Sequence, residues 1–294
     1  MENTGMKRVL ITGANGFIGR NTKELLNSAC DLYAPQRSEL NLLCEKSVRE
    51  YICDNRIDIV FNLANPNPVK NPIDKQDTMF EDSIRIFLNL YRAQDSYEIM
   101  YTFGSGAEFD KSMDIVQVSE EDENRSIPSD SYGLAKYTIN QIITQSVKQC
   151  NLRIFGCYGP TDHDSKFITH AIRCCINHQD ITIRQDCYFD YIHVFDVGHI
   201  MLFFVNNMPH YRSYNVCSGT RVLLSEIAEI VKNEMKSDSN IVILKSGLNK
   251  EYTASNRRLL DEIGEYRFIS LEEGIRMQIQ SEREALEINE KKSS

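Results

Sequence analysis

A tyrosine and a lysine stand four residues apart at the start of an expected helix. Tyr132 and Lys136 belong to the stretch that runs from Pro128 to Lys136. Positions i and i+4 share one face of a helix, so the phenol and the ammonium can point into one pocket. A free phenol has a pKa of about 10, and a neighbouring cation favours its phenolate. The pair therefore predicts a proton donor or acceptor, unless it is an ordinary surface pair.

A glycine-rich turn follows the first expected strand. The residues are Gly13-Ala14-Asn15-Gly16-Phe17-Ile18-Gly19, between an apolar run that ends at Thr12 and a helical run. Strand, glycine turn and helix are the context that a dinucleotide-binding turn requires. Gly13 would permit the tight turn, Gly16 would let the backbone approach a pyrophosphate, and Gly19 would let helix and strand pack closely. The spacing is G-x-x-G-x-x-G, not the more common G-x-G-x-x-G.

The second expected strand, 31–37, ends without the acidic residue that would hold the ribose 2′-hydroxyl of NAD. Arg37 stands there instead, and its guanidinium is suited to a 2′-phosphate. We therefore predict NADP as the cofactor, with NAD as the alternative. A solvated loop arginine would carry no such information.

Strands and helices alternate through the first half of the chain. Expected strands at 57–64 and 99–103 alternate with expected helices at 47–55 and 77–95. This alternation is typical of a parallel sheet with right-handed crossovers, which binds ligands beyond the carboxyl ends of its strands. The glycine turn, Asn65, Ser105 and the loop before Tyr132 would then share one edge of the sheet.

Composition narrows the class of protein. The chain has 294 residues, 41% of them hydrophobic and 26% charged, which suits one large α/β domain or a nucleotide domain with a smaller lobe. A net charge of −9 without a basic run argues against nucleic-acid binding. Nine cysteines without a CxxC pair indicate reduced thiols in a cytoplasmic protein, and we expect no metal site. No signal peptide is evident, and no apolar run approaches the roughly 20 residues that span a bilayer, so no membrane is expected.

Taken together, these pieces resemble the extended short-chain dehydrogenase/reductases that act on nucleotide sugars, including GDP-fucose synthases and 4-keto-sugar reductases. The matching stretches are 12–19, 104–109, 132–136, 152–160, 190–197, 214–219 and 270–275. The resemblance implies a Rossmann-type doubly wound parallel sheet with a smaller C-terminal α/β substrate lobe. We place the Rossmann domain at 1–160 and the lobe at 161–280, with a segment near 190–216 returning to the Rossmann domain. The polar run 281–294 is expected to fray.

The resemblance also implies roles for particular residues. Tyr132 would be the catalytic acid or base, Lys136 would hold the nicotinamide ribose and lower the pKa of Tyr132, and Ser105 would hydrogen-bond the reacting oxygen. Cofactor contacts are implied for Gly13, Asn15, Gly16, Phe17, Ile18, Gly19, Arg37, Asn41, Leu42, Leu63, Ala64, Tyr132, Lys136 and Phe155. Contacts to a nucleotide-sugar substrate are implied for Asn65, Ser105, Gly106, Lys166, Phe167 and Arg184. A homodimer through helices near 77–95 and 131–149 is implied as well.

The two residues that follow Ser105 limit the reactions that this site could catalyse. Sugar 4,6-dehydratases of this family carry an Asp-Glu pair there, and GDP-fucose synthases carry a Cys at the second place; this chain has Gly106 and Ala107. Neither residue is an acid, a base or a thiol, so dehydration, decarboxylation and double epimerisation are not expected. A single hydride transfer needs only a matched proton donor or acceptor on the oxygen.

We therefore predict an NADP-dependent reductase of a nucleotide-linked 4-keto-6-deoxy sugar, in surface-polysaccharide biosynthesis. The first alternative is a nucleotide-sugar 4-epimerase with tightly bound NAD. The second is a cofactor-binding regulator without turnover, although such proteins typically lose the Tyr or the Lys that this chain retains.

The expected grip on the substrate diphosphate departs from the family pattern. The family commonly has Asn where this chain has Gly156, and Arg where it has Phe189. Lys166, Arg184 and Arg212 could supply the missing charge, or they could be solvated surface residues. His193 lies inside a strand-like run and is expected to be a core residue.

Overall fold

A parallel six-stranded sheet forms the centre of the protein. The computed structural model describes residues 5–66 and 74–293. The strand order is β11-β6-β4-β3-β1-β2, and every neighbouring pair is parallel. Its strands are β1 (Arg8–Thr12), β2 (Asp31–Tyr33), β3 (Ile59–Asn62), β4 (Ile99–Ser105), β6 (Gln149–Ile154) and β11 (Ser213–Val216). The order reverses at β1, which has β2 on one side and β3 on the other, and such a switch point opens a ligand crevice.

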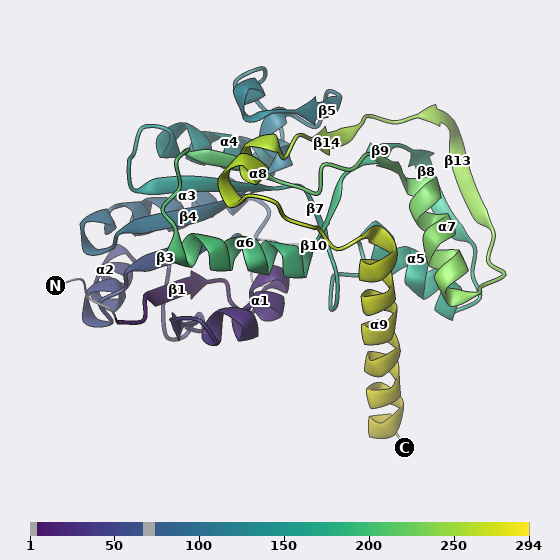
Figure 1. The fold of residues 1–294 in the computed structure, drawn as a ribbon, viewed down its shortest axis with the longest axis horizontal. Coiled ribbons are helices and arrows are strands. Elements are labelled where there is room, and N and C mark those ends of the chain that lie inside the picture. The colour runs from purple at the N-terminus through teal and green to yellow at the C-terminus, as the bar shows by residue number, and fades with distance from the viewer. Residues whose placement is uncertain (1–4, 67–73, 294) are drawn as a thin grey trace.

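Helices cover both faces of this sheet (Figure 1). Val9 and Ile11 point into one apolar core and Leu10 points into the other, because neighbouring residues of a strand face opposite ways. The first core lies under α1 (Phe17–Asn27), α6 (Val194–Asn206) and α8 (Arg257–Ile263). The second lies under α2 (Glu45–Asp54), α3 (Met79–Tyr91) and α4 (Ser131–Ile143). The predicted α/β class with a doubly wound parallel sheet is confirmed.

A smaller group of elements follows in the C-terminal half. Its own apolar core includes Ile172, Ile183, Val231 and Ile275. The elements around that core are α5 (Phe167–Ile176), β8 (Ile181–Asp186), α7 (Leu224–Met235), β13 (Ile241–Leu248) and α9 (Leu271–Ser293). β13 pairs in parallel with β8, and α7 packs against both α5 and α9.

Two small sheets join this lobe to the central sheet. One is four-stranded, in the order β12 (Val222–Leu223), β9 (Tyr188–Phe189), β14 (Tyr252–Ala254) and β5 (Ile115–Val118). The other pairs β7 (Gly156–Tyr158) with β10 (Tyr191–His193). The four-stranded sheet includes β5 from the first half of the chain, so it brings C-terminal side chains close to the end of β4.

Some boundaries differ from the sequence predictions. The helix expected near 131–149 ends at Ile143, because the chain must turn before it enters β6. The helix expected near 77–95 ends at Tyr91. The run 281–294, expected to fray, is helical as far as Ser293: Glu282 is buried and its carboxylate lies 2.9 Å from the Arg173 guanidinium, which anchors the helix to the body.

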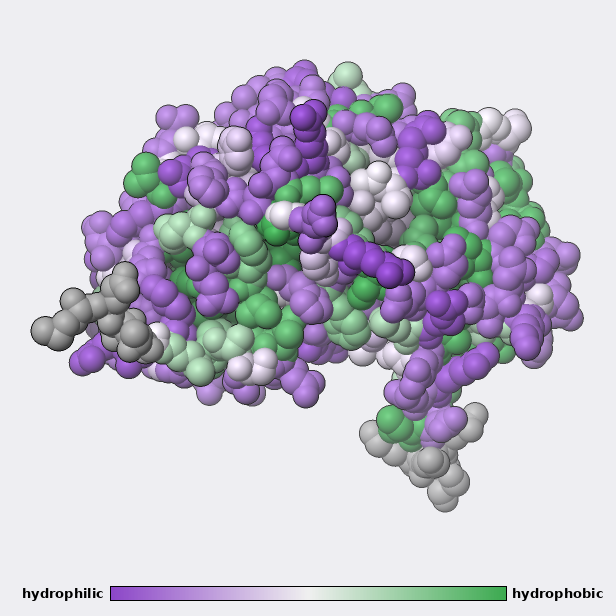
Figure 2. All heavy atoms as spheres, viewed as in Figure 1, coloured by the Kyte–Doolittle hydropathy of each residue, from purple (hydrophilic) through white to green (hydrophobic). Residues whose placement is uncertain are grey.

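The surface adds two observations. Beyond this contact α9 projects from the rest of the protein (Figure 1), and the coloured part of this projection in Figure 2 is mostly hydrophilic. Within residues 5–66 and 74–293, no helix is both long and apolar enough to cross a lipid bilayer.

Candidate active site

The glycine turn after β1 is built from close backbone contacts. Gly13 has a φ of +68°, and a Cβ added to it would lie 2.9 Å from the Ala64 backbone. A Cβ on Gly19 would lie 2.6 Å from the Cα of Ala14. Gly16 is the N-cap of α1 and donates its N–H to the Gly13 carbonyl at 2.9 Å. A side chain at Gly13 or Gly19 would therefore force the turn apart.

The first turn of α1 has the character of an anion site. The N-cap Gly16 has no side chain to occupy the N–H groups of the first turn, which a helix leaves without partners of its own. Asn15 and Gly16 are exposed, and Phe17 and Ile18 are half-buried. Helix N-termini of this kind bind phosphates. The turn therefore fits the pyrophosphate of a dinucleotide.

Arg37, the residue expected to bind a 2′-phosphate, lies beside a carboxylate in the structure. The Arg37 guanidinium lies 3.1 Å from the Asp74 carboxylate, and the arginine side chain is 61% exposed. Asn41 uses its side-chain oxygen to accept the Leu43 N–H, and the Leu42 carbonyl accepts from Asn89. Arg37 can reach a 2′-phosphate by rotation, but Asp74 competes for it.

Ser105 ends β4 at the carboxyl edge of the sheet. It is the N-cap of the short helix η2 (Gly106–Phe109). Its hydroxyl accepts the Ala107 N–H at 3.2 Å, while its own N–H donates to the Glu108 carboxylate at 2.9 Å. This reciprocal capping box fixes the backbone that carries the hydroxyl.

Tyr132 and Lys136 come to the same edge from α4. Asp130 caps this helix by accepting the Gly133 N–H at 2.9 Å. The Lys136 ammonium is buried and donates to the Phe103 carbonyl of β4 at 2.7 Å. It lies 5.9 Å from the centroid of the Tyr132 ring. The sequence predicted these three side chains separately, and the structure brings Ser105, Tyr132 and Lys136 together.

Burial dominates the titration of this pair. Burial raises the pKa of Tyr132 above its ordinary value, the nearby Ser105 hydroxyl lowers that pKa, and the Glu108 and Asp130 carboxylates raise it further. Burial lowers the pKa of Lys136 to about 8, although the Glu108 carboxylate acts in the opposite direction. Tyr132 therefore keeps its proton at neutral pH, which is the form that a proton donor needs.

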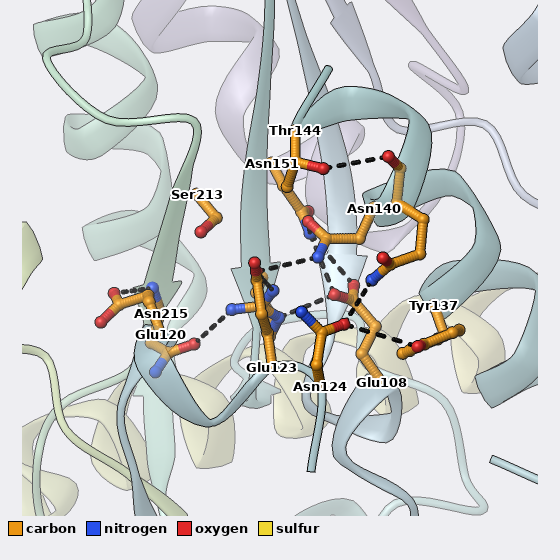
Figure 3. A network of polar contacts seen from close by, with 12 residues as sticks. Glu108, Glu120, Glu123, Asn124, Tyr137, Asn140, Thr144, Asn151, Ser213 and Asn215 are labelled. Carbon is orange, nitrogen blue, oxygen red and sulfur yellow. Dashed lines mark hydrogen bonds and ion pairs between the residues drawn. The ribbon is translucent and has the colours of Figure 1, made fainter. Parts of the chain in front are cut away.

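Glu108, which accepts the Ser105 N–H, belongs to a buried network of polar contacts that includes Asn151 and Asn140 (Figure 3). The Glu108 carboxylate lies 2.7 Å from the Arg153 guanidinium, and both side chains are almost fully buried. Asn151 donates to Glu108 at 3.0 Å, and Arg153 donates to Asn215 at 3.0 Å. The sequence analysis gave Glu108 and Arg153 no role. The available signal was a charged residue inside the apolar strand run Leu152-Arg153-Ile154, because a buried charge needs a partner.

Tyr252 was also missed, and it lies close to Ser105 and Gly106 at the end of β4. A Cβ added to Gly106 would lie 2.5 Å from the Tyr252 hydroxyl and 2.6 Å from the Phe155 ring. The Tyr252 and Phe155 ring centroids are 5.1 Å apart. No motif marks Tyr252, because its position depends on β14 joining the small sheet.

Gly156 and Phe189, the two residues that differ from the family pattern near the expected substrate diphosphate, lie against each other. A Cβ on Gly156 would lie 2.4 Å from the Asp190 carbonyl oxygen and 2.6 Å from the Phe189 ring, so the glycine makes room both for the neighbouring backbone and for the phenylalanine. Phe189 in turn stacks on Tyr252, with ring centroids 4.8 Å apart. An aromatic surface therefore stands where the family commonly has an amide and a guanidinium.

The remaining candidates for substrate contact lie in different places. Asn65 donates to the Pro66 carbonyl of its own loop at 2.7 Å. Phe167 packs against the core of the C-terminal lobe. Lys166, the N-cap of α5, and Arg184 of β8 are both exposed. Within the described residues neither cation has a hydrogen-bond or ion-pair partner, so both remain candidates for a substrate phosphate.

Arg212 is not at this edge of the sheet. Its guanidinium donates to the Val147 carbonyl at 2.8 Å, just before β6 begins. Since ligands bind at the carboxyl ends of the strands, Arg212 lies at the wrong end to hold a substrate. His193 is fully buried, where its Nδ1 accepts the Phe195 N–H, and burial lowers its pKa to about 4. In the described part of the chain, no group of three or more His, Cys, Asp or Glu side chains could hold a metal ion.

Comparison with known proteins identifies the class. A model of the NAD dependent epimerase/dehydratase family matches residues 9–217, which is more than half of the chain. The protein belongs to this family, and the resemblance found in its sequence is confirmed.

Particular relatives can then be named. The ADP-L-glycero-D-manno-heptose-6-epimerase of Pseudomonas paraeruginosa is 22% identical, over 91% of this chain and 96% of the relative. GDP-mannoheptose C4 reductase from Campylobacter jejuni, solved with NADP bound, superimposes with a TM-score of 0.80 at 17% identity, covering 95% of this chain and 98% of that one. A GDP-L-fucose synthetase from Naegleria fowleri gives 0.82 at 15% identity, covering 96% and 94%. At these identities the structural likeness shows the fold.

Proposed function

We propose that the protein is an NADP-dependent reductase that transfers one hydride to C4 of a nucleotide-linked 4-keto-6-deoxy sugar, in surface-polysaccharide biosynthesis. One observation carries the proposal: Ser105, Tyr132 and Lys136 meet at one edge of the sheet, beside Gly106 and Ala107. Tyr132 is the proton donor, and neither Gly106 nor Ala107 supplies an acid, a base or a thiol for a second reaction at the sugar. The fold of a GDP-mannoheptose C4 reductase, itself solved with NADP, supports this choice.

The cofactor would be held by residues from both sides of the switch point. The turn from Gly13 to Gly19 fits the pyrophosphate, and Arg37 fits a 2′-phosphate. Lys136 and Phe155 would border the nicotinamide ribose and ring. When it is bound, the cofactor supplies the hydride.

The protein supplies the proton and the orientation. Ser105 donates a hydrogen bond to the carbonyl oxygen and holds it toward Tyr132. As the carbonyl carbon gains the hydride, Tyr132 gives its phenolic proton to the oxygen, so that C=O becomes H–C–O–H and the phenol becomes a phenolate. The Lys136 ammonium stabilises that phenolate, and a proton from water restores the phenol.

The substrate nucleotide would approach from the C-terminal lobe. Lys166 and Arg184 provide exposed cations for its phosphates, and Asn65, Gly106 and Phe167 would border the remainder of the substrate. The aromatic surface of Phe189 replaces the family's guanidinium, so we expect the diphosphate to lie nearer to Lys166 and Arg184 than to position 189.

The test is NADPH oxidation, followed by absorbance, with GDP-, dTDP-, UDP- and CDP-linked 4-keto-6-deoxyhexoses. We expect one of them to be reduced, and Tyr132→Phe to lower kcat about 10²- to 10⁴-fold while NADPH still binds. Turnover by Tyr132→Phe equal to that of the unaltered protein would sink the mechanism.

A 4-epimerase is the second candidate, because the Arg37–Asp74 pair leaves the preference for a 2′-phosphate undecided and one relative is an epimerase. An epimerase would retain NAD through purification and would interconvert 4-hydroxy sugars without consuming NADPH. Copurified NAD together with no NADPH oxidation would therefore replace the reductase with the epimerase.

We also infer a homodimer through α3 and α4. These helices pack against each other on one face of the sheet, and Phe80 of α3 is exposed. Light scattering should give twice the chain mass of 33.9 kDa. A monomer mass, or an unchanged mass after Phe80→Glu, would contradict this interface.

A further inference from the structure

Three hydroxyl groups meet at the end of β4. The Tyr252 hydroxyl lies so close to Gly106 that a Cβ added there would be 2.5 Å from it. The hydroxyl of Ser105, the preceding residue, is near enough to the Tyr132 phenol and to the Tyr252 phenol to lower the pKa of each. The serine therefore lies between two tyrosines, one from α4 and one from β14.

The Tyr252 ring is fixed by its neighbours. β14 pairs in parallel with β5 and with β9, so that Tyr252 lies opposite both Ile115 and Phe189. The ring stacks on Phe189, with centroids 4.8 Å apart, and tilts against Phe155 at 5.1 Å. A side chain held between two rings on a paired strand presents its hydroxyl in one place, as a preorganised site requires.

We propose that Tyr252 is a further catalytic residue, whose hydroxyl donates a hydrogen bond to the same substrate oxygen that Tyr132 protonates. This inference rests on the proposed reductase function. A ketone oxygen has two lone pairs, which Ser105 and Tyr132 can occupy. The alkoxide-like oxygen of the transition state has three, so a third donor acts most strongly there.

Tyr252 moves no proton in this scheme. Burial raises the pKa of its phenol far above the ordinary value, so it remains a neutral donor throughout. The hydride still comes from the nicotinamide and the proton from Tyr132, so atoms and charges balance as before.

The same arrangement gives Gly106 a positive role. A side chain there would strike both Tyr252 and Phe155, as the 2.5 Å and 2.6 Å contacts of an added Cβ show. Gly106 stands where the sugar 4,6-dehydratases carry an acidic residue. In this chain the glycine also leaves the space in which the Tyr252 hydroxyl approaches Ser105.

Tyr252→Phe is the first test, because it removes the hydroxyl and keeps the ring stack. With NADPH and the 4-keto-6-deoxyhexose nucleotides, we expect kcat to fall about 10- to 100-fold. KM, NADPH affinity and the unfolding midpoint should stay unchanged. A kcat equal to that of the unaltered protein, or a change in KM alone, would overturn the proposal.

Tyr188→Phe is the matched control. Tyr188 precedes Phe189 on β9, so its side chain points to the other face of the small sheet, where the Arg221 guanidinium lies 3.4 Å from its ring centroid. Loss of this hydroxyl should leave kcat unchanged.

Gly106→Ala provides a second variant. The new methyl group should displace the Tyr252 hydroxyl and lower kcat to a similar extent. If Tyr252 acts through this contact, adding Tyr252→Phe to Gly106→Ala should cost little more, since the two changes remove one interaction. Fully additive losses would contradict the proposal.

A third measurement needs no sugar substrate. Tyr132 faces the Lys136 and Lys111 ammonium groups, the Glu108 and Asp130 carboxylates, and the cluster of Ser105 and Tyr252. NMR of ¹³Cζ-labelled tyrosine, with NADP⁺ added, reports the pH at which Tyr132 ionises. We expect that pH to rise in Tyr252→Phe, because a donor to the cluster is lost, and to stay the same in Tyr188→Phe.

The two proposals fail in different ways. If the unaltered protein turned over none of the keto sugars, the reductase function would fall, while the NMR titration would still decide whether Tyr252 is coupled to Tyr132. If the unaltered protein turned over normally, and Tyr252→Phe changed neither kcat nor the pH at which Tyr132 ionises, the proposal for Tyr252 would be wrong. The proposed reductase function would then still hold.

Discussion

The two sides of this site use glycine for different purposes. On the cofactor side, Gly13 and Gly19 let backbone approach backbone, and their partners Ala64 and Ala14 come from the loop after the adjacent strand β3 and from the same turn. On the other side, Gly106 and Gly156 make room for aromatic rings, among them Tyr252 of β14 and Phe189 of β9, and Gly156 also lies against the Asp190 carbonyl. The first kind of glycine belongs to a local motif. The second kind depends on a long-range fit.

The contrast explains why the family motif holds on one side and fails on the other. The turn before α1 must accommodate a dinucleotide, whose shape does not vary. In the proposed function the lobe accommodates one particular substrate, so its side chains need not follow the family pattern. Gly156 and Phe189, the two departures from the family pattern, lie against each other in the structure.

The largest effect is expected at Arg153, where the two sides meet beneath Ser105. Arg153→Met leaves the Glu108 carboxylate buried without its cation and should lower the free energy of unfolding by about 3–5 kcal/mol. Urea denaturation measures this. Lys7→Met breaks the exposed Lys7–Glu98 pair and should cost only about 0–1 kcal/mol. Equal effects of the two changes would mean that the buried pair does not support the site.

The second largest effect is expected at Gly13, whose close contacts belong to the glycine turn. Gly13→Ala must adopt a φ of +68° and crowd Ala64, so we expect NADPH affinity to fall at least about tenfold. Gly247 has a similar φ of +75°, but nothing lies within 4 Å of an added Cβ. Gly247→Ala should therefore cost about 1 kcal/mol of stability and leave NADPH affinity unchanged. Fluorescence titration with NADPH compares them, and a Gly13→Ala variant that binds normally would contradict the model of the turn.

A smaller effect is expected at Gly156, and a second substitution should partly reverse it. Gly156→Ala places a methyl group against Phe189, which we expect to cost about 1–3 kcal/mol of unfolding free energy. Phe189→Leu removes the ring edge that the methyl group strikes, while the closer contact with the Asp190 carbonyl oxygen, 2.4 Å from an added Cβ, remains, so the rescue should be partial. In the double variant the cost should be less than the sum, by about 0.5–3 kcal/mol. Additive losses in thermal or urea unfolding would show that the two departures are independent.

The smallest effect is expected at Asp74. Asp74→Asn removes a carboxylate that competes for Arg37, so NADP⁺ should bind a few-fold more tightly while NAD⁺ affinity stays the same. Arg37→Ala should do the reverse and remove the preference for NADP⁺. Titrations with both dinucleotides measure this, and an unchanged ratio of affinities in Arg37→Ala would remove Arg37 from the cofactor site.

Much of the fold and of the cofactor side was predictable from sequence. Buried strands such as Ile59–Asn62 are short apolar runs, and the alternation with helices predicts a parallel sheet. Arg212 was wrongly included among the candidate cations. Its distance from the site is set by where β6 and β11 begin, and that register could not be located from composition or spacing.

What the sequence by itself determined was the local chemistry. A helix sets Tyr132 and Lys136 on one face, and a strand that ends in Ser105 exposes its last side chain at the edge, because both depend only on short-range backbone geometry. Tertiary structure alone decided which groups come from elsewhere. Tyr252 reaches Ser105 because β14 joins β9 and β5, and Arg153 meets Glu108 because β6 lies beside β4. Such contacts depend on long-range strand pairing, and no local pattern encodes it.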